Sequence, residues 1–291
     1  MNKMTLRVLS LMLLANSVWA QLPETDIFLC SIEKKDGKYS FTVPENITSR
    51  PGYDNQPYFT PDGRSILYVA FEDTIQSDVY RYELAAGISI QITETKESEF
   101  SPVLTPDRNH LSVVRVDADS GQRLYVLPLD DIQKPVFIQS SEDIGYYCWL
   151  DETTVSMFIL GERFTLQSLS LKTHERKLIA SDVGRCMKLN PDSSGMYFIL
   201  KSNPEEWYIY LLNKEDYSLE RIAATLPGSE DFDILPDGTL LMGNEGRLFS
   251  LENGKWNVVA DFTKELGDFY RISISPDGKR LAMVAFQGKK P

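Results

Sequence analysis

The chain has 291 residues, with 30 Lys and Arg against 42 Asp and Glu, which gives a formal net charge of −12. With 42% apolar and 25% charged residues, the composition is that of a globular protein rather than of a disordered one. The acidic balance argues against a nucleic-acid partner, because phosphate binding needs a basic surface. Since only two histidines are present, we expect no histidine-rich metal site.

The first twenty residues have the pattern of a secretory signal peptide. Lys3 and Arg7 form a positive region, residues 9–15 form an apolar core, and Val18 and Ala20 occupy the −3 and −1 positions of a cleavage site. A membrane anchor is the alternative, but the apolar run is about half of the ~20 residues that a span needs. No later segment is apolar enough to cross a bilayer. We therefore predict export, to the periplasm or the medium, with a cleaved signal peptide.

A Pro-Asp turn signature recurs along the rest of the chain. Its six copies are spaced by 40 to 45 residues, with aspartates at Asp62, Asp107, Asp151, Asp192, Asp237 and Asp277. The copy at Asp151 has leucine in place of proline. Proline presets the backbone for a tight turn and aspartate bonds its own backbone, so each copy is expected to join two antiparallel strands. Near-even spacing over six copies indicates a repeat protein.

The strands expected around the turns define the fold. Each turn stands between two β-rich segments, and two further strands complete each unit, without helical periodicity after residue 20. The last unit has a single strand after its turn, over 281–286, and the missing pair is found at 26–32 and 39–43. We therefore predict an all-β, six-bladed β-propeller of four-stranded antiparallel blades, closed by N- and C-terminal strands in the same blade. An open pair of β-sandwiches is the alternative.

The domain boundaries follow from this prediction. Residues 1–20 are the signal peptide and 21–291 the propeller, in which 21–45 supply the outer strands of the closing blade. The six blades are expected to start near residues 56, 101, 145, 186, 231 and 271.

The turns carry a family resemblance. The Pro-Asp-Gly segments at 61–63, 236–238 and 276–278, with partial matches at 106–107 and 191–192, resemble the WD40-like PD40 repeats of TolB-type six-bladed propellers. The resemblance covers essentially the whole chain after residue 20 and is specific for architecture rather than for function. TolB proteins are periplasmic and carry an α/β domain ahead of the propeller. Because blade strands begin here shortly after the signal peptide, we expect the propeller alone.

The sequence contains no clear catalytic motif. A Gly-x-Ser-x-Gly nucleophile elbow is absent. His110 and His174 are expected on the face of the Pro-Asp turns, away from the face on which we expect binding. The acidic run at Asp117 lacks the last acid of an EF-hand loop, where Pro128 stands instead. We expect no catalytic residue, no metal site and no cofactor, with a divalent cation such as calcium in the channel as the alternative.

A polar row of residues precedes the turns. The positions five residues before each proline, or before Leu150, are Gln56, Ser101, Gly145, Cys186, Asp231 and Arg271. The next row is apolar and is expected to pack between blades. We predict that the polar row rings the mouth of the central channel, opposite the turns, where propellers bind ligands. The candidate binding residues are Gln56, Ser101, Arg185, Glu230, Asp231 and Arg271. The alternative is a water-filled funnel whose charges pair only with one another.

Two function classes fit these features. The first is a monomeric, non-enzymatic scaffold of the cell envelope that binds a protein or peptide, with the acidic charge favouring basic partners. The second is a lyase or hydrolase that acts on carbohydrate or peptide through carboxylates on the face opposite the turns. The missing nucleophile motif and the scarce histidines favour the scaffold. Paired carboxylates of raised pKa on that face would favour the enzyme.

Overall fold

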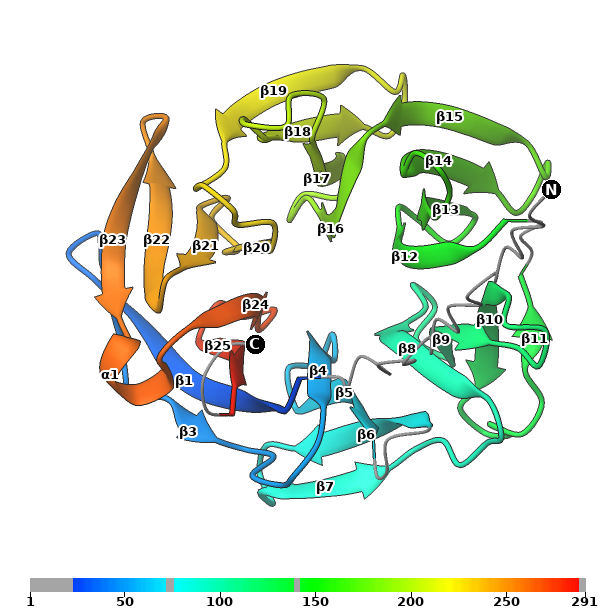
Figure 1. Cartoon of the computed structure of the whole chain (residues 1–291), viewed down its shortest axis with the longest axis horizontal. Coiled ribbons are helices and arrows are strands. Elements are labelled where there is room, and N and C mark those ends of the chain that lie inside the picture. Colours follow the sequence, from blue (N-terminus) through cyan, green and yellow to red (C-terminus); the bar gives the residue numbers. More distant parts are fainter. Residues whose placement is uncertain (1–22, 72–75, 139–141, 288–291) are drawn as a thin grey trace, which may run out of the picture.

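The computed structural model describes residues 23–71, 76–138 and 142–287, and its strands form six antiparallel sheets arranged around a central axis. Figure 1 shows the innermost strands β4, β8, β12, β16, β20 and β24 surrounding this axis, with the outermost strands at the perimeter. The predicted six-bladed β-propeller is therefore confirmed. The predicted signal peptide lies outside the described residues.

Five blades contain four consecutive strands each. Blade 1 consists of β4 (Asp54–Phe59), β5 (Ser65–Phe71), β6 (Ser77–Glu83) and β7 (Ile88–Gln91). Blade 2 consists of β8 (Ser98–Leu104), β9 (His110–Val116), β10 (Gln122–Pro128) and β11 (Val136–Phe137). Blade 3 consists of β12 (Ile144–Trp149), β13 (Thr154–Ile159), β14 (Thr165–Ser170) and β15 (Arg176–Ser181). Blade 4 consists of β16 (Val183–Leu189), β17 (Gly195–Leu200), β18 (Tyr208–Asn213) and β19 (Leu219–Ala224). Blade 5 consists of β20 (Phe232–Ile234), β21 (Leu240–Asn244), β22 (Arg247–Glu252) and β23 (Lys255–Asp261).

The closing blade joins the two ends of the chain. It consists of β24 (Phe269–Ile274), β25 (Arg280–Phe286), β1 (Thr25–Lys35), β2 (Lys38–Phe41) and β3 (Glu45–Asn46). Strand β1 pairs with β25 from Thr25 opposite Phe286 to Ser31 opposite Arg280. The last four residues of β1 pair with β2, and Phe28 and Leu29 in the middle of β1 pair with β3. Because no covalent bond links β1 to β25, hydrogen bonds and side-chain packing alone close the ring at this point.

The hydrophobic core is divided among the interfaces between blades. The described residues form six clusters of buried side chains, one at each interface between neighbouring blades. Phe198 of blade 4, for example, packs in a cluster with Leu166 of blade 3. At the ring closure, Ile27 of β1 packs in a cluster with Tyr68 of blade 1. Each blade therefore depends on both of its neighbours to bury its two faces.

The Pro-Asp turns share one hydrogen-bond pattern. In all six copies the aspartate accepts a hydrogen bond of 2.8–3.1 Å from the backbone N–H two residues later. In three copies a Thr or Ser two residues earlier also donates its hydroxyl to the carboxylate, as Thr60 does to Asp62. This local bonding explains why the signature recurs at the end of every innermost strand.

The described residues contain one helix, the four-residue α1 (Thr263–Leu266), which connects β23 to β24. Within the same residues, no helix is long and apolar enough to cross a membrane.

Candidate binding site in the central channel

Irregular backbone turns the predicted polar row toward the channel. The register of β4 against β5 shifts between Asn55 and Tyr58, and the innermost strands of blades 2, 3, 4 and the closing blade carry equivalent bulges. Gln56 and Ser101, inside these bulges, have φ values of 56° and 54°. A bulge re-aims the side chains near it, and these bulges place the row at the ring's centre.

One buried carboxylate holds two arginines beside the channel. Asp231, whose side chain is 8% exposed, lies immediately before β20. Its oxygens form ion pairs with the guanidinium groups of Arg185, on β16, and Arg271, on β24. Burial acts to raise the pKa of Asp231, but the two arginines outweigh it and hold that pKa below its usual value. The carboxylate is therefore ionised at neutral pH.

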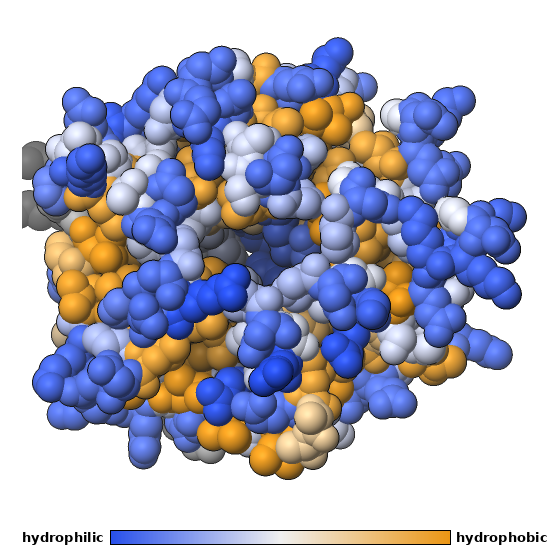
Figure 2. All heavy atoms as spheres, turned by 180° about the vertical axis from the view of Figure 1, so that it is seen from behind, coloured by the Kyte–Doolittle hydropathy of each residue, from blue (hydrophilic) through white to orange (hydrophobic). Residues whose placement is uncertain are grey.

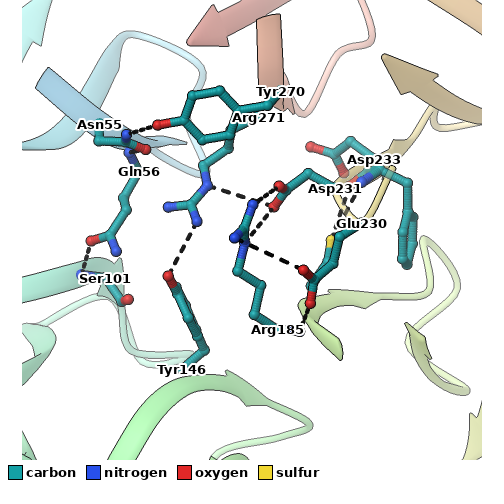
Figure 3. A network of polar contacts seen from close by, with 12 residues as sticks. Asn55, Gln56, Ser101, Tyr146, Arg185, Glu230, Asp231, Asp233, Tyr270 and Arg271 are labelled. Carbon is teal, nitrogen blue, oxygen red and sulfur yellow. Dashed lines mark hydrogen bonds and ion pairs between the residues drawn. The ribbon is translucent and has the colours of Figure 1, made fainter. Parts of the chain in front are cut away.

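A contact across the ring extends this network. Arg271 Nη2 donates a hydrogen bond of 3.2 Å to the hydroxyl of Tyr146, and the guanidinium carbon lies 5.4 Å from the centre of that ring. Tyr146 belongs to β12, on the opposite side of the propeller from β24 (Figure 1). Figure 3 shows the two side chains reaching toward each other across the centre. The network therefore spans the channel instead of lining one wall.

Neutral hydrogen bonds connect the remaining innermost strands. The backbone N–H of Ser101 donates to Gln56 Oε1 over 2.5 Å, which joins β8 to β4. Asn55 donates to the hydroxyl of Tyr270, which joins β4 to β24. Tyr147 donates to the carbonyl of Ser101 over 2.8 Å, which joins β12 to β8. Together with the ion pairs, these contacts link the six blades at the level of the polar row. Figure 3 shows the bonds of Gln56 with Ser101 and of Asn55 with Tyr270.

A cavity of about 520 Å³ extends from this level. Its lining includes Gln56, Ser101, Arg185, Asp231 and Arg271 at the polar row, and residues of the Pro-Asp turns at the other end: Pro61, Pro106, Arg108 and Ser193. Several of these turn residues are exposed, so the cavity opens on the turn face. Figure 2 shows one face of the ring hollowed at its centre, with hydrophilic residues inside the hollow.

The polar row lies at the end of this cavity away from the turns, and its side chains bond to one another there. The length and charge of these side chains allow this pairing. Arg271 reaches across the ring to Tyr146, and Arg185 reaches to the neighbouring blade.

The structure also changes the membership of the row. The backbone N–H of Leu150 donates to the carbonyl of Thr154, as the backbone N–H of Leu235 donates to the carbonyl of Thr239. Leu150 therefore corresponds to Leu235, and Asp151 takes the position that Pro236 has in blade 5. Counting back from Leu150 as if it were the proline therefore goes one residue too far. The row's member in blade 3 is Tyr146, which lines the cavity, and not the expected Gly145. The missing proline was the signal that could have revealed this shift.

Glu230 differs from the other predicted residues. Its Oε1 accepts a hydrogen bond of 2.6 Å from the backbone N–H of Arg185 and forms an ion pair of 3.0 Å with Lys201. It is not among the residues that line the cavity. Conversely, Lys188 and Arg108 line the cavity and were not predicted. Both lie near the turn ends of their blades, where the polar-row argument did not look.

Carboxylates of raised pKa lie outside the channel cavity. One is Asp54 at the start of β4, whose pKa burial raises to about 6, and two lie at the junction of blades 1 and 2. Burial raises the pKa of Glu99 to about 7, and burial also raises the pKa of Asp78. The hydroxyl of Thr93 contacts both carboxylates, at 3.2 and 3.4 Å. Glu99 is fully buried. Neither carboxylate lines the channel cavity.

No group of three or more His, Cys, Asp or Glu side chains arranged to bind a metal occurs within residues 23–71, 76–138 and 142–287. The charged groups that line the channel are instead suited to bind an ionic group of a ligand directly.

Comparison with known proteins identifies the architecture. No protein-family model matches the sequence, and no curated protein matches it. Among solved structures, the chain is similar to a putative TolB from Agrobacterium tumefaciens, with a TM-score of 0.70 and 15% identity over 91% of this chain and 99% of that chain. The chain has the TolB-type propeller fold.

Two enzymes have related folds. An oligogalacturonate lyase solved with manganese gives a TM-score of 0.53 and 16% identity, over 91% of this chain and 98% of that chain. A gluconolactonase from Xanthomonas campestris gives a TM-score of 0.60 and 8% identity, over 93% of this chain and 99% of that chain. Because one fold serves these different proteins, the function has to be argued from the site.

Proposed function

We propose that this protein is a non-enzymatic binding scaffold that holds a segment of a partner polypeptide in its channel cavity. The observation that carries the proposal is the lining of that cavity by innermost-strand residues, or the residue directly before the strand, from all six blades. A rigid ring of strands presents such a cavity with little conformational adjustment, which favours binding.

The protonation states of the lining side chains favour binding over chemistry. Arg185 and Arg271 keep Asp231 ionised, so it cannot donate a proton at neutral pH. Burial raises the pKa of the Cys148 and Cys186 thiols to about 12, so these thiols stay protonated and are poor nucleophiles. These groups are suited to hold a ligand rather than to transform it.

Site-specific photo-crosslinking tests the proposal. A photoreactive amino acid replaces Leu189, which lines the cavity and is 37% exposed, or Leu178, which is 61% exposed on the outer strand β15. With an envelope extract, we expect the substitution at Leu189 to give a discrete cross-linked polypeptide and the one at Leu178 to give none. Equal cross-linking at both positions, or none at Leu189, contradicts channel binding.

We infer in addition that the protein acts outside the cytoplasm, in the periplasm or the medium. The support is the signal-peptide pattern of residues 1–20. Mass spectrometry of the protein recovered from its cells tests this: we expect a chain that starts at Gln21. A chain that retains Lys3 and Arg7 contradicts export with cleavage.

A hydrolase or lyase is the second candidate. It is favoured by Glu99, because a carboxyl group with a pKa near 7 suits a general acid. Glu99 borders a second cavity of about 360 Å³, beside Arg115. The rank of this candidate is lower because Glu99 has no exposed surface and both of its carboxylate oxygens already accept hydrogen bonds, from Thr93 and Thr95. Incubation with acidic and neutral polysaccharides tests it. Cleavage that is lost in Glu99→Gln would establish this candidate, and cleavage unaffected by that substitution would exclude Glu99 as its acid.

A further inference from the structure

We propose that the channel cavity recognises the free C-terminal carboxylate of an apolar polypeptide tail, which enters from the turn face with its carboxylate at the polar row. This inference rests on the proposed function and specifies the chemistry of the segment that is bound.

Hydrogen-bond donors exceed acceptors at the inner end of the cavity. Arg271 uses Nε and Nη2 for Asp231 and Tyr146, while its Nη1 has no partner within the described residues (Figure 3). The side-chain amide of Gln56 must present its oxygen to the backbone N–H of Ser101. The two Nε2 hydrogens of Gln56 therefore have no acceptor among the described residues. The Ser101 hydroxyl also has no partner within the described residues, but the atom has no accessible surface, so the donors that a ligand reaches are those of Arg271 and Gln56. A ligand that fits these groups supplies acceptor oxygens.

The charge of the lining specifies an anion. The charged residues that line the cavity are Arg108, Arg185, Lys188, Arg271 and Asp231. Asp233 pairs with Lys188 over 2.9 Å, and Asp231 pairs with both inner arginines. Glu230, which pairs with Lys201 over 3.0 Å, also lies 3.9 Å from Arg185. Arg108 forms no ion pair in the described structure. The cavity thus carries an excess of cationic groups in a chain of net charge −12. The total charge favours a basic partner, but this lining favours an anionic group, because the local charge acts on a bound group.

The walls between the two ends are largely apolar. They include Tyr58, Pro102, Val103, Leu104, Trp149 and Met187. From Gln56 to Pro61 the wall runs along five residues of chain, roughly 16 Å at the rise of a β-strand. An extended peptide of about five residues spans that distance. Apolar side chains are therefore expected along the tail.

The direction of entry follows from the position of the donors. Because the cavity opens at the turns and the free donors of Arg271 and Gln56 lie at its inner end, a carboxylate at the very end of a chain reaches them without the chain passing through the ring. A carboxylate in the middle of a segment would require the chain to enter and return through the same opening. The free C-terminus fits this geometry better than an internal Asp or Glu.

Peptide binding to the purified protein tests the inference. The probes are N-acetylated pentapeptides with randomised apolar residues, synthesised with either a free carboxylate or a C-terminal amide. We expect the free acids to bind at least about tenfold more tightly than the matched amides. Gln56→Glu is isosteric, keeps an acceptor for the Ser101 N–H and places a carboxylate beside Arg271, so we expect it to weaken binding of the free acids by about tenfold or more. Gln122→Glu, at the start of β10, adds the same charge away from the cavity and is expected to bind as the parent does.

The outcomes separate this inference from the proposed function. Equal binding of acids and amides overturns the carboxylate inference and leaves channel binding of a segment intact. Equal weakening by Gln122→Glu and Gln56→Glu, at matched melting temperatures, shows a general charge effect and also overturns the inference. Peptides with an internal glutamate and an amidated end that bind as tightly as the free acids overturn terminal recognition. If neither this library nor the photo-crosslinking shows a bound polypeptide, the proposed function fails as well.

Discussion

Asp231 is the carboxylate on which the arrangement of the two inner arginines depends. Removing its charge leaves the guanidinium groups of Arg185 and Arg271, which lie on neighbouring sides of it, partly buried without their main counter-ion. Breaking a buried ion pair from one side typically costs about 3–5 kcal/mol. We therefore expect Asp231→Asn to lower the free energy of unfolding by about this amount, measured by urea denaturation.

The matched control for Asp231 is Asp130→Asn, because Asp130 is exposed between β10 and β11. This control is expected to change the unfolding free energy by less than about 0.5 kcal/mol. Equal stability of the two variants would contradict the structural role described for Asp231.

Glu99 gives the stability of the protein a pH dependence of its own. It lies with Asp78 and Arg115 around it, and burial raises its pKa from 4.5 to about 7. The unfolded chain therefore loses this proton at lower pH than the folded chain does. The contribution of Glu99 to stability is fully present below about pH 4.5 and is lost as the pH rises to about 7.

The variant Glu99→Gln removes this titration and retains groups that can bond Thr93 and Thr95. We expect the melting temperature of the parent to fall relative to that of the variant between pH 5 and pH 7. The shift of the pKa corresponds to at most about 3 kcal/mol. A difference in melting temperature that stays constant over this range would show that Glu99 is ionised in the folded protein.

At the scale of elements, β1 is the strand that completes the ring. It fills the position between β25 and the outer strands of the closing blade, and its Ile27 is fully buried against blade 1. Deleting residues 21–45 removes β1 and β2 and exposes the edge of β25. We expect the shortened protein to lose its cooperative thermal transition or to melt far below the parent, as followed by circular dichroism.

Two point substitutions in strands give this prediction a finer control. Ile27→Ala is expected to cost about 2–5 kcal/mol, because it leaves a cavity in the core. Ile88→Ala removes the same atoms from β7, where the side chain is 52% exposed, and is expected to cost less than about 0.5 kcal/mol. A truncated protein that melts like the parent would contradict closure through β1.

At the scale of the whole molecule, the six turn aspartates all affect the pH dependence of stability in the same direction. All six have pKa values below the usual value for aspartate. In Asp62, Asp107 and Asp277 the largest cause is the hydroxyl two residues earlier, which bonds the ionised carboxylate. A lowered pKa in the folded state stabilises the fold above the usual pKa of about 3.8, and this stabilisation is lost as the pH falls further.

We therefore expect the free energy of unfolding to decline steeply below about pH 4. The triple variant Asp62→Asn, Asp107→Asn and Asp277→Asn is expected to be less stable at pH 7 and to show a shallower decline in acid. Urea denaturation at pH 7, 4 and 3 measures both effects. Parallel acid profiles for the parent and the triple variant would contradict the role of the turns.

The sequence by itself determined the architecture of this protein. Turn signatures and strand patterns are local, because a proline, an aspartate and alternating apolar residues act on their immediate neighbours. They were enough to predict six blades and the pairing of the chain ends, which β1 and β25 confirm. Five of the six candidate binding residues also line the channel cavity.

The tertiary structure decided what those residues do. The contacts between Arg271 and Tyr146, and between Asp231 and Arg185, join positions 125 and 46 residues apart. No local pattern encodes these contacts, because they depend on bulges, side-chain length and the curvature of the closed ring. The same geometry gives an acidic protein a cavity with an excess of cationic groups, since burial and proximity, not the total charge, determine the field at a binding site.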